Sequence, residues 1–291
     1  MERPRLIIKA FESFTRRRSN TNSEEEGRIW QEFEQIKPQL EGKTILIIMD
    51  GNRRYAEERG WERKIGHKIG VENAKDLSRF LLSLKMNVVL WGFSTDNWKR
   101  DPSEAENIFK ISNQALIDSI DEMDEKNVRV RHLGDKERLP SYLQETIANA
   151  EERTRGNTGP FFQIALSYSG RDEINRAGMN IAKKLANREL VITEDGKRLK
   201  DPTLEDREGK TLIELIKENS DDKGSAFEID FVLRPGGVFR LSGFGIRAEF
   251  SEYSFSDKNF PEFITVDLVK ALIELTKRDR RFGGDSKPQI E

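Results

Sequence analysis

One carboxylate stands at the end of an apolar run, and two arginines follow it closely. The run TILIIM ends at Asp50, and Gly51, Asn52, Arg53 and Arg54 come next. Taken alone, Asp-Gly-Asn is typical of a strand-to-helix turn in which an Asp or Asn side chain caps the following helix. Such a turn does not require an adjacent pair of arginines, so the stretch needs a second explanation.

The same change from apolar to polar residues occurs at the ends of other apolar runs. VLWGF leads into STDNWKR, VRHL into GD, FFQIAL into SYSGR, and FVL into RPGGVFRLSG. In an open parallel sheet the carboxyl ends of the strands lie along one edge, and ligands bind there. This edge would gather arginine, hydroxyl and amide side chains, namely Arg53, Arg54, Arg63, Arg100, Arg234, Arg240, Ser94, Ser242, Asn52 and Asn97.

A group of this composition is suited to phosphate. Guanidinium groups bind phosphate oxygens through paired hydrogen bonds, and glycine turns such as Gly236–Gly237 add backbone amides. The many separate arginines predict two phosphorylated groups rather than one. Asp50 then suits Mg²⁺, which prefers one or two carboxylates together with phosphate oxygens and water. The sequences G-x-x-x-x-G-K-[ST] and G-x-G-x-x-G are absent, which disfavours P-loop and dinucleotide folds.

Alternating patterns define the elements that must position these residues. Short apolar runs predict strands at TILIIM, NVVLWGF, VRVRHL, FFQIAL and EIDFVL, with amphipathic helices around them. One helix opens at Pro102, with Ser103 and Glu106 in capping-box register. The alternation implies right-handed crossovers. We therefore expect a single α/β domain with a mainly parallel central sheet of about six strands flanked by helices, and a substrate site at the carboxyl ends of the strands.

Composition excludes several classes of function. The 291 residues carry 50 basic and 52 acidic side chains, a net charge of −2, so nothing attracts nucleic acid globally. There is no cysteine, which excludes disulfides and cysteine-rich zinc sites, and two histidines cannot form a multi-histidine metal centre. No apolar run approaches the roughly 20 residues that span a bilayer, and the start lacks the apolar core of a secretory signal. We expect a cytoplasmic protein.

The chain divides into an N-terminal appendage, residues 1–27, and a catalytic domain, residues 28–291. The appendage begins with RLIIKAFESFTRRRSN, whose apolar residues have helical spacing, and the polar, acidic stretch from Ser19 to Gly27 is predicted to be a linker. The helix would either pack on the body of the protein, which the prevalence of amphipathic surface helices favours, or make peripheral contact with anionic lipid.

The motifs, taken together, resemble the cis-prenyltransferases, the undecaprenyl and dehydrodolichyl diphosphate synthase family. They are I-M-D-G-N-R-R-Y-A, G-H-K-x-G, F-S-T-D-N-W-K-R, G-N-T-G, R-P-G-G-x-x-R-L-S-G-F and the terminal R-R-F-G-G, in family order. The resemblance implies a Mg²⁺-dependent condensation of isopentenyl diphosphate with an allylic diphosphate, which forms a Z double bond and releases pyrophosphate. It also implies a homodimer and an apolar tunnel for the growing chain.

The resemblance assigns roles to individual residues. Asp50 would be catalytic and hold Mg²⁺, with Glu252 as the second metal carboxylate and Glu249 as the fallback. Asn97 would assist proton removal, beside Ser94, Trp98 and Arg100 of a flap that positions substrate. The allylic diphosphate would be bound by Gly51, Asn52, Arg53, Arg54, Arg63 and His67, and the isopentenyl diphosphate by Arg234, Arg240 and Ser242. The tunnel lining would include Phe80, Leu81, Leu84, Ile108, Ile111, Leu116 and Ile120, which are equally suited to an ordinary core.

The sequence departs from the family pattern in one region. Pro235 stands where the family has threonine and Val238 where it has glutamate, and GIRAEFSEY replaces the usual run after Phe244. These changes leave two alternatives beside the regular synthase. One is the same fold with another prenyl acceptor or a different coupling. The other is a non-catalytic partner subunit, against which the retained Asp-Gly-Asn turn argues.

Overall fold

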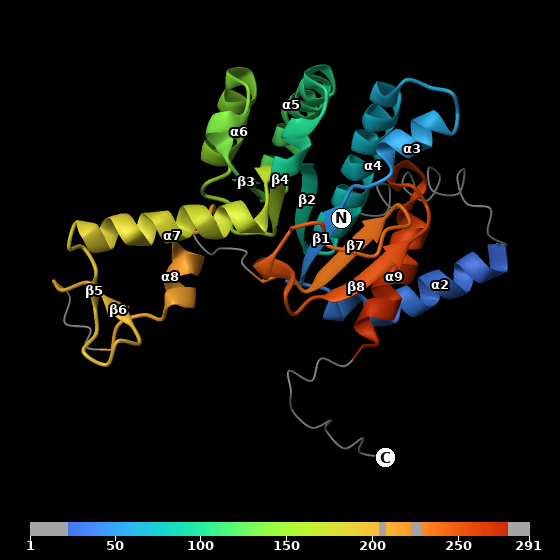
Figure 1. Cartoon of the computed structure of the whole chain (residues 1–291). Coiled ribbons are helices and arrows are strands. Elements are labelled where there is room, and N and C mark those ends of the chain that lie inside the picture. Colours follow the sequence, from blue (N-terminus) through green and yellow to red (C-terminus); the bar gives the residue numbers. More distant parts are fainter. Residues whose placement is uncertain (1–22, 204–207, 223–227, 279–291) are drawn as a thin grey trace, which may run out of the picture.

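Six parallel strands form the central sheet of this computed structural model, which describes residues 23–203, 208–222 and 228–278. The strand order is β3-β4-β2-β1-β7-β8, and every pairing in it is parallel (Figure 1). The strands are β1 (Thr44–Ile48), β2 (Asn87–Ser94), β3 (Arg129–Leu133), β4 (Phe161–Tyr168), β7 (Phe231–Pro235) and β8 (Glu252–Ser256). The predicted fold class is confirmed. The N-terminal segment of residues 1–22 and the R-R-F-G-G tail lie outside the described residues.

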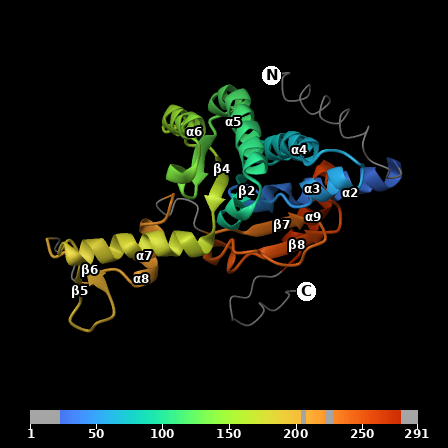
Figure 2. The ribbon, with the colours of Figure 1, turned by 45° about the horizontal axis from the view of Figure 1, so that its top comes forward.

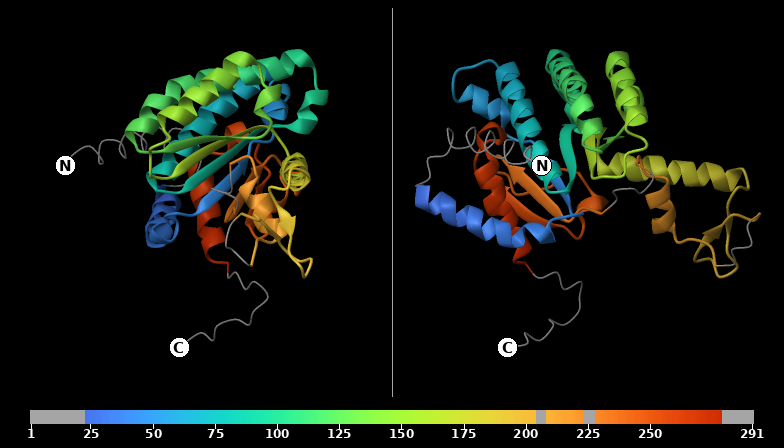
Figure 3. Two further views of the ribbon diagram at one scale, coloured as in Figure 1. Left: turned by 90° about the vertical axis from the view of Figure 1, so that its left-hand side faces the viewer. Right: turned by 180° about the vertical axis from the view of Figure 1, so that it is seen from behind.

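The strands alternate between two apolar clusters, as expected for a period of two. In β1, Ile45 and Ile47 belong to a large cluster, whereas Leu46 and Ile48 belong to a smaller one on the other face. Helices α4, α5, α6 and α9 contribute to the large cluster, while the small cluster is completed largely by the segment after β7. Figure 3 shows how the helices are arranged around the sheet. The helices are α2 (Ser23–Ile36), α3 (Asn52–Glu57), α4 (Arg63–Ser83), α5 (Pro102–Glu125), α6 (Ser141–Arg153), α7 (Gly170–Ala186), α8 (Leu212–Glu218) and α9 (Thr265–Thr276).

One part of the chain extends away from the sheet. Helix α7 leaves the end of β4 and leads to a two-stranded antiparallel ribbon, β5 (Val191–Ile192) and β6 (Leu199–Lys200), and then to α8 (Figure 1). This arm contains the polar stretch after Thr193 that interrupts the alternating pattern of the sequence. None of the described helices has the length and apolarity to cross a bilayer.

The linker prediction is wrong from Ser23 to Gly27, because α2 begins at Ser23. Three glutamates in the first turn, Glu24 to Glu26, suit the positive end of a helix dipole, so an acidic stretch that resembles a linker is a solvated helix start. Further along, Trp30 and Phe33 meet Phe80 of α4, and α2 lies beside α9 (Figure 2). This helix is therefore part of the body.

Two other local predictions need correction. Helix α5 is capped by Asp101, whose Oδ1 accepts the backbone N–H of Ser103 at 2.8 Å, so Ser103 lies inside the helix and is not its cap. Strand β8 was not among the predicted strands. Its residues are all partly exposed, as befits a sheet edge, and so it lacks the continuous apolar run that identified the others.

Candidate active site

The crevice at the carboxyl ends of β1 and β7 brings the predicted residues together. The connection after β1 leads to α3 and α4 on one face of the sheet, whereas the segment after β7 covers the opposite face. Neighbouring strands whose connections diverge in this way leave a binding crevice between them. A cavity of about 550 Å³ lies here, lined by Asp50, Gly51, Asn52, Arg53, Arg54, Arg63, His67, Ser94, Asn97, Arg100, Arg234, Arg240 and Ser242.

Asp50 lies at the centre of this crevice between two arginines. Its Oδ2 accepts from Arg234 at 2.8 Å, and its Oδ1 accepts from Arg54 at 3.0 Å and from the N–H of Gly51 at 2.7 Å. Partial burial raises the pKa of the carboxyl, but the hydrogen bond and charge of Arg234, with help from Arg54, outweigh this and lower the pKa. Asp50 is therefore ionised at neutral pH.

Two glycines allow the chain to approach Asp50 closely. Gly51 has φ +96°, and a Cβ there would lie 2.4 Å from Oδ1 of Asn259. Gly236 has φ +103°, and a Cβ there would lie 2.8 Å from the Arg54 guanidinium, which donates to the Gly236 carbonyl at 2.5 Å. Both positions combine a left-handed backbone with close contact, so only glycine fits them without strain.

The residues predicted to bind isopentenyl diphosphate form what we call the Arg234 cluster: Arg234, Arg240 and Ser242. Arg234 is only 4% exposed, and it donates to Ser242 Oγ at 2.8 Å and to the backbone carbonyl of Arg240. Arg240 is exposed, and its Nε lies 3.3 Å from the same Oγ. The buried guanidinium thus joins the Asp50 carboxylate to the loop after β7.

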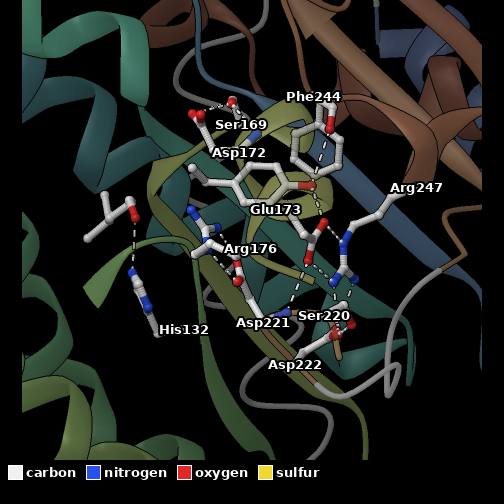
Figure 4. A network of polar contacts seen from close by, with 12 residues as sticks. His132, Ser169, Asp172, Glu173, Arg176, Ser220, Asp221, Asp222, Phe244 and Arg247 are labelled. Atoms are coloured by element: carbon white, nitrogen blue, oxygen red, sulfur yellow. Dashed lines mark hydrogen bonds and ion pairs between the residues drawn. The ribbon is translucent and has the colours of Figure 1, made fainter. Parts of the chain in front are cut away.

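A buried polar network lies behind that loop (Figure 4). Arg247 donates to Glu173 at 2.5 and 2.8 Å and to Asp222 at 2.8 and 3.0 Å, and both ion-pair partners are almost fully buried. The Tyr168 hydroxyl lies 2.9 Å from Glu173 and donates to the carbonyl of Phe244 at 3.2 Å. The network ties α7 to the segment that carries Ser242.

Opposite this loop lies the Glu104 cluster: Arg53, Arg63, His67, Arg100 and Glu104. Glu104 receives a hydrogen bond from Arg100 at 3.1 Å and lies 3.7 Å from Arg63, 3.7 Å from His67 Nε2 and 3.8 Å from Arg53. Burial, above all, lowers the pKa of His67 to about 4, although Glu104 opposes the shift, so the imidazole is neutral at pH 7. Sequence reasoning missed Glu104, which reads simply as an acid in the first turn of α5.

The turn after β2 holds its polar residues by reciprocal bonds, and it turns Trp98 away from the cavity. Asn97 Oδ1 accepts the N–H of Ser94 at 3.0 Å, and Ser94 Oγ accepts the N–H of Asp96 at 3.2 Å. Trp98 packs on Phe93 and donates to Ser167 Oγ at 3.0 Å. In this arrangement the ring of Trp98 packs at the edge of the core and does not line the cavity, and its place in a flap that positions substrate stays a prediction.

Glu252 lies at the wrong end of the sheet to share an ion with Asp50 of the same chain. It begins β8 and is in register with Phe231 at the start of β7, which is in turn beside Ile45 of β1. Asp50 follows the opposite end of β1. The pairing of these two carboxylates within one chain is wrong, and the fallback Glu249 precedes β8 at the same distant end. Comparison with the family motifs identified Glu252 in the sequence, but it could not show in which direction strand β8 runs.

The donors around Asp50 fit a Mg²⁺ ion that substrate completes. In the described ranges, no three His, Asp or Glu side chains converge as a metal site, so the protein alone offers no closed cage. Asp50 Oδ2 accepts a hydrogen bond from Arg234, and a carboxylate oxygen has capacity for two. One carboxylate oxygen beside several phosphate-binding arginines matches the usual magnesium arrangement of carboxylate, phosphate and water.

A second, apolar cavity of about 80 Å³ lies behind the crevice, between α4 and α5. Met49 and Gly92 line both cavities, so the two adjoin. Of the residues predicted to line a tunnel, only Leu116 does so here; Ile108 lines the polar crevice instead, and the others pack elsewhere. The α4 face that meets the cavity carries Ala74 and Ser78, whose small side chains leave the space.

An α/β sheet with a carboxylate and two arginine groups at its crevice defines a class of enzyme that binds phosphorylated substrates. Comparison with known proteins makes this specific. Residues 48–283 match the family model described as "Putative undecaprenyl diphosphate synthase". The chain belongs to this family and is a prenyltransferase.

Individual relatives agree with this assignment. An isoprenyl transferase of Clostridium perfringens is 34% identical over 83% of this chain and 90% of its own length, and that of Shouchella clausii is 34% identical over 86% and 91%. Among solved structures, a lavandulyl diphosphate synthase of Lavandula x intermedia in complex with dimethylallyl diphosphate has a TM-score of 0.73 at 28% identity, covering 84% of this chain and 99% of that one. A probable undecaprenyl diphosphate synthase of Campylobacter jejuni has a TM-score of 0.63 at 28% identity and the same coverage.

Proposed function

We propose that this enzyme condenses isopentenyl diphosphate with an allylic diphosphate to give a Z-configured polyprenyl diphosphate, with Mg²⁺ as cofactor. The observation that carries the proposal is the placement of two cationic groups on opposite sides of Asp50, the Glu104 cluster and the Arg234 cluster, over one cavity. Two diphosphates repel each other in water, and separate arginine groups offset that repulsion. The adjoining apolar cavity suits a hydrocarbon chain.

The proposed reaction breaks one bond and forms another. The C1–O bond of the allylic substrate breaks, C1 bonds to the terminal carbon of isopentenyl diphosphate, and a proton leaves the latter to create the double bond. Charge grows on the departing pyrophosphate, so the arginines of the Glu104 cluster stabilise the transition state more than the ground state. A Mg²⁺ ion held by Asp50 and phosphate oxygens would add Lewis-acid stabilisation of that charge.

Other residues of the chain would bind the isopentenyl diphosphate and assist the removal of the proton. Arg234, Arg240 and Ser242 would hold the isopentenyl diphosphate, with Arg234 fixed by its bond to Asp50. Asn97, which lines the cavity beside Ser94, would assist the departure of the proton. We further propose a cytoplasmic homodimer in which the catalytic domain starts with α2 at residue 23. The N-terminal residues 1–22 would pack on it or contact lipid, as the helical spacing of their apolar residues predicts.

Product analysis tests the proposal. Dimethylallyl, geranyl and farnesyl diphosphates are offered separately with Mg²⁺ and labelled isopentenyl diphosphate, and products are identified by mass spectrometry and their bond geometry by NMR. We expect elongated Z products from at least one primer, their loss with EDTA, and their loss in Asp50→Ala. If no primer is extended, or if Asp50→Ala retains full activity, the proposal is wrong.

A second candidate is the same chemistry with a different acceptor or coupling. It is favoured by Pro235 and Val238, which stand in the loop of the Arg234 cluster, and by the structural likeness to a protein named lavandulyl diphosphate synthase and bound to dimethylallyl diphosphate. Incubation with dimethylallyl diphosphate alone distinguishes the two. A coupled product in the absence of isopentenyl diphosphate supports the second candidate, and regular Z chains alone count against it.

A further inference from the structure

A single carboxylate organises one side of the crevice. Glu104 lies within 4 Å of Arg53, Arg63, Arg100 and His67, and its own side chain is only 10% exposed. These four neighbours come from α3, α4 and the turn before α5, so one acid connects three separate segments of the chain. None of the four makes a comparably short contact with Asp50, the carboxylate on which the proposed reaction depends.

The position of Glu104 is favourable for an acid even without these partners. It lies in the first turn of α5, after the cap residue Asp101, where the helix dipole stabilises negative charge. Its backbone N–H is bonded to the Asp101 carbonyl at 3.0 Å, so the carboxylate is held by a short, well-anchored segment. The Glu104 side chain is thus anchored by its own helix before any substrate arrives.

The charges of the cluster leave room for an anion. Three guanidiniums face two carboxylates, Glu104 and the Glu57 that Arg63 also contacts, and the imidazole is neutral, so the cluster keeps a positive excess. Without Glu104 the guanidiniums of Arg53, Arg63 and Arg100 would repel one another and would adopt separate rotamers in solvent. Preorganised donors bind a developing anion better than donors that must be gathered when it arrives.

The opposite interpretation is that Glu104 only competes with phosphate for the same arginines. The two interpretations predict opposite changes in the affinity for the allylic diphosphate when the charge of Glu104 is removed. A competitor, once neutralised, leaves the arginines freer to bind phosphate, so the affinity for an allylic diphosphate increases. An organiser, once neutralised, lets the arginines separate, so the affinity decreases. The bond from Arg100 at 3.1 Å and the looser contacts at 3.7 to 3.8 Å favour the organiser, because the carboxylate leaves most donors of Arg53 and Arg63 available.

We propose that Glu104 is a positioning residue that holds Arg53, Arg63 and Arg100 in one arrangement for the diphosphate of the allylic substrate. This inference rests on the proposed function for the identity of the substrate. It adds to that function a residue that touches neither substrate nor metal and acts on one of the two substrates only.

The test compares Glu104→Gln with Glu104→Asp and with a matched control. Glutamine keeps the size of the side chain and removes its charge, and aspartate keeps the charge on a shorter stem. Glu106→Gln is the control, since Glu106 lies on the same helix and contacts Tyr142 and Lys110 outside the cavity. Steady-state KM values are measured for the allylic and the isopentenyl diphosphate separately, and circular dichroism confirms that each variant is folded.

We expect Glu104→Gln to raise the KM of the allylic diphosphate about tenfold and to change that of isopentenyl diphosphate less than about threefold. Glu104→Asp should recover part of the loss, and Glu106→Gln should resemble the unsubstituted enzyme. A lower allylic KM in Glu104→Gln, or an equal rise in both KM values, would overturn the proposal.

A binding measurement separates this inference from the proposed function. Calorimetric titration with inorganic pyrophosphate needs no turnover, and we expect weaker binding to Glu104→Gln than to the unsubstituted chain and to Glu106→Gln. If no primer is extended, the proposed function fails, yet the pyrophosphate comparison still decides the role of Glu104. Unchanged or tighter pyrophosphate binding contradicts that role.

Discussion

The two cationic clusters of the crevice are built in different ways. In the Arg234 cluster, the guanidinium of Arg234 is 5% exposed and is fixed by a carboxylate, a hydroxyl and a backbone carbonyl. In the Glu104 cluster, the Arg53 and Arg63 side chains are 37% and 50% exposed, and both lie within 4 Å of the Glu104 carboxylate. One cluster is fixed by the folded core and the other by its own charges. Substitutions in or behind the Arg234 cluster should therefore act by disturbing the folded structure. Substitutions in the Glu104 cluster should act by changing the electrostatics of substrate binding.

The largest expected effect follows from the network behind the Arg234 cluster. Arg247→Met removes the partner of two buried carboxylates, Glu173 and Asp222, and breaking a buried ion pair on one side costs about 3–5 kcal/mol. Burial alone raises the pKa of Asp222, and the hydrogen bond and charge of Arg247 lower it to about 2. Loss of the arginine therefore leaves a buried acid whose charged form has lost its main stabilising partner. Urea denaturation measures the loss.

Arg176→Met is the matched control for this prediction. Arg176 binds Asp221, the neighbour of Asp222, at 2.6 and 3.1 Å, but its side chain is 32% exposed (Figure 4). More exposed pairs contribute about 1 kcal/mol or less, so the control should lose far less stability. Equal losses in the two variants would show that the buried network is not what holds the loop.

The second effect concerns pH. Burial lowers the pKa of His132 to about 4, and its ring is bonded to the Leu166 carbonyl at 3.0 Å. The unfolded chain takes up a proton as pH falls through about 6.5, while the folded chain stays neutral until about 4, so stability is lost across that window, by about 3 kcal/mol for a shift of this size. The pKa of Asp50 is lowered from 3.8, so Asp50 contributes only below the window.

Urea midpoints at pH 7 and pH 4.5 measure this loss. His132→Gln should flatten the dependence, and His67→Gln should flatten it too, since burial, as the largest cause, also lowers the pKa of His67 to about 4. The two variants should differ in activity at pH 7, because His67 lines the crevice and His132 does not. If neither substitution changes the slope, the histidines are not neutral in the fold.

The third effect compares arginine with lysine in each cluster. Arg234→Lys keeps the charge but cannot reach Asp50, Ser242 and the Arg240 carbonyl together, because lysine lacks the planar fork. We expect kcat/KM to fall about a hundredfold, on the order of 2–3 kcal/mol. Arg53→Lys should lower kcat/KM less than about fivefold, since Arg53 is held by a long ion pair with Glu104 at 3.8 Å. A larger loss of kcat/KM in Arg53→Lys than in Arg234→Lys would contradict the comparison between the clusters.

The same comparison explains what the sequence could predict. Residues that follow apolar strands, such as Asp50 and Arg234, could be placed at one edge, because strand ends are visible in the pattern and parallel strands end together. Glu104 is part of no strand end, and its partners meet only through the packing of α3, α4 and α5. The pairing of Glu252 with Asp50 of the same chain could not be tested from the sequence for the complementary reason, since its edge strand has no apolar run to mark where the strand starts or in which direction it runs.

The packing of Trp98 and the start of α2 could not be predicted, because the local sequence does not determine what a residue packs against. An indole after the motif F-S-T-D-N could face either the crevice or the core, and a hydrogen bond to Ser167, 69 positions away, decides for the core. An acidic stretch at residues 23–27 could begin a helix or continue a linker, and its contacts with α9 decide for the helix. Both decisions depend on long-range packing.

The smallest effect is expected at Glu57, the second acid that meets the Glu104 cluster. Its Oε1 accepts from Arg63 at 2.7 Å, a shorter contact than that between Arg63 and Glu104, but both side chains are about half exposed. Exposed pairs contribute about 0–1 kcal/mol, so Glu57→Gln should change the allylic KM by no more than about threefold. Distance alone predicts the opposite order, with Glu57 ahead of Glu104. If Glu57→Gln proves the more damaging of the two, short contacts and not burial govern this wall of the crevice, and the contrast with the Arg234 cluster loses its physical basis.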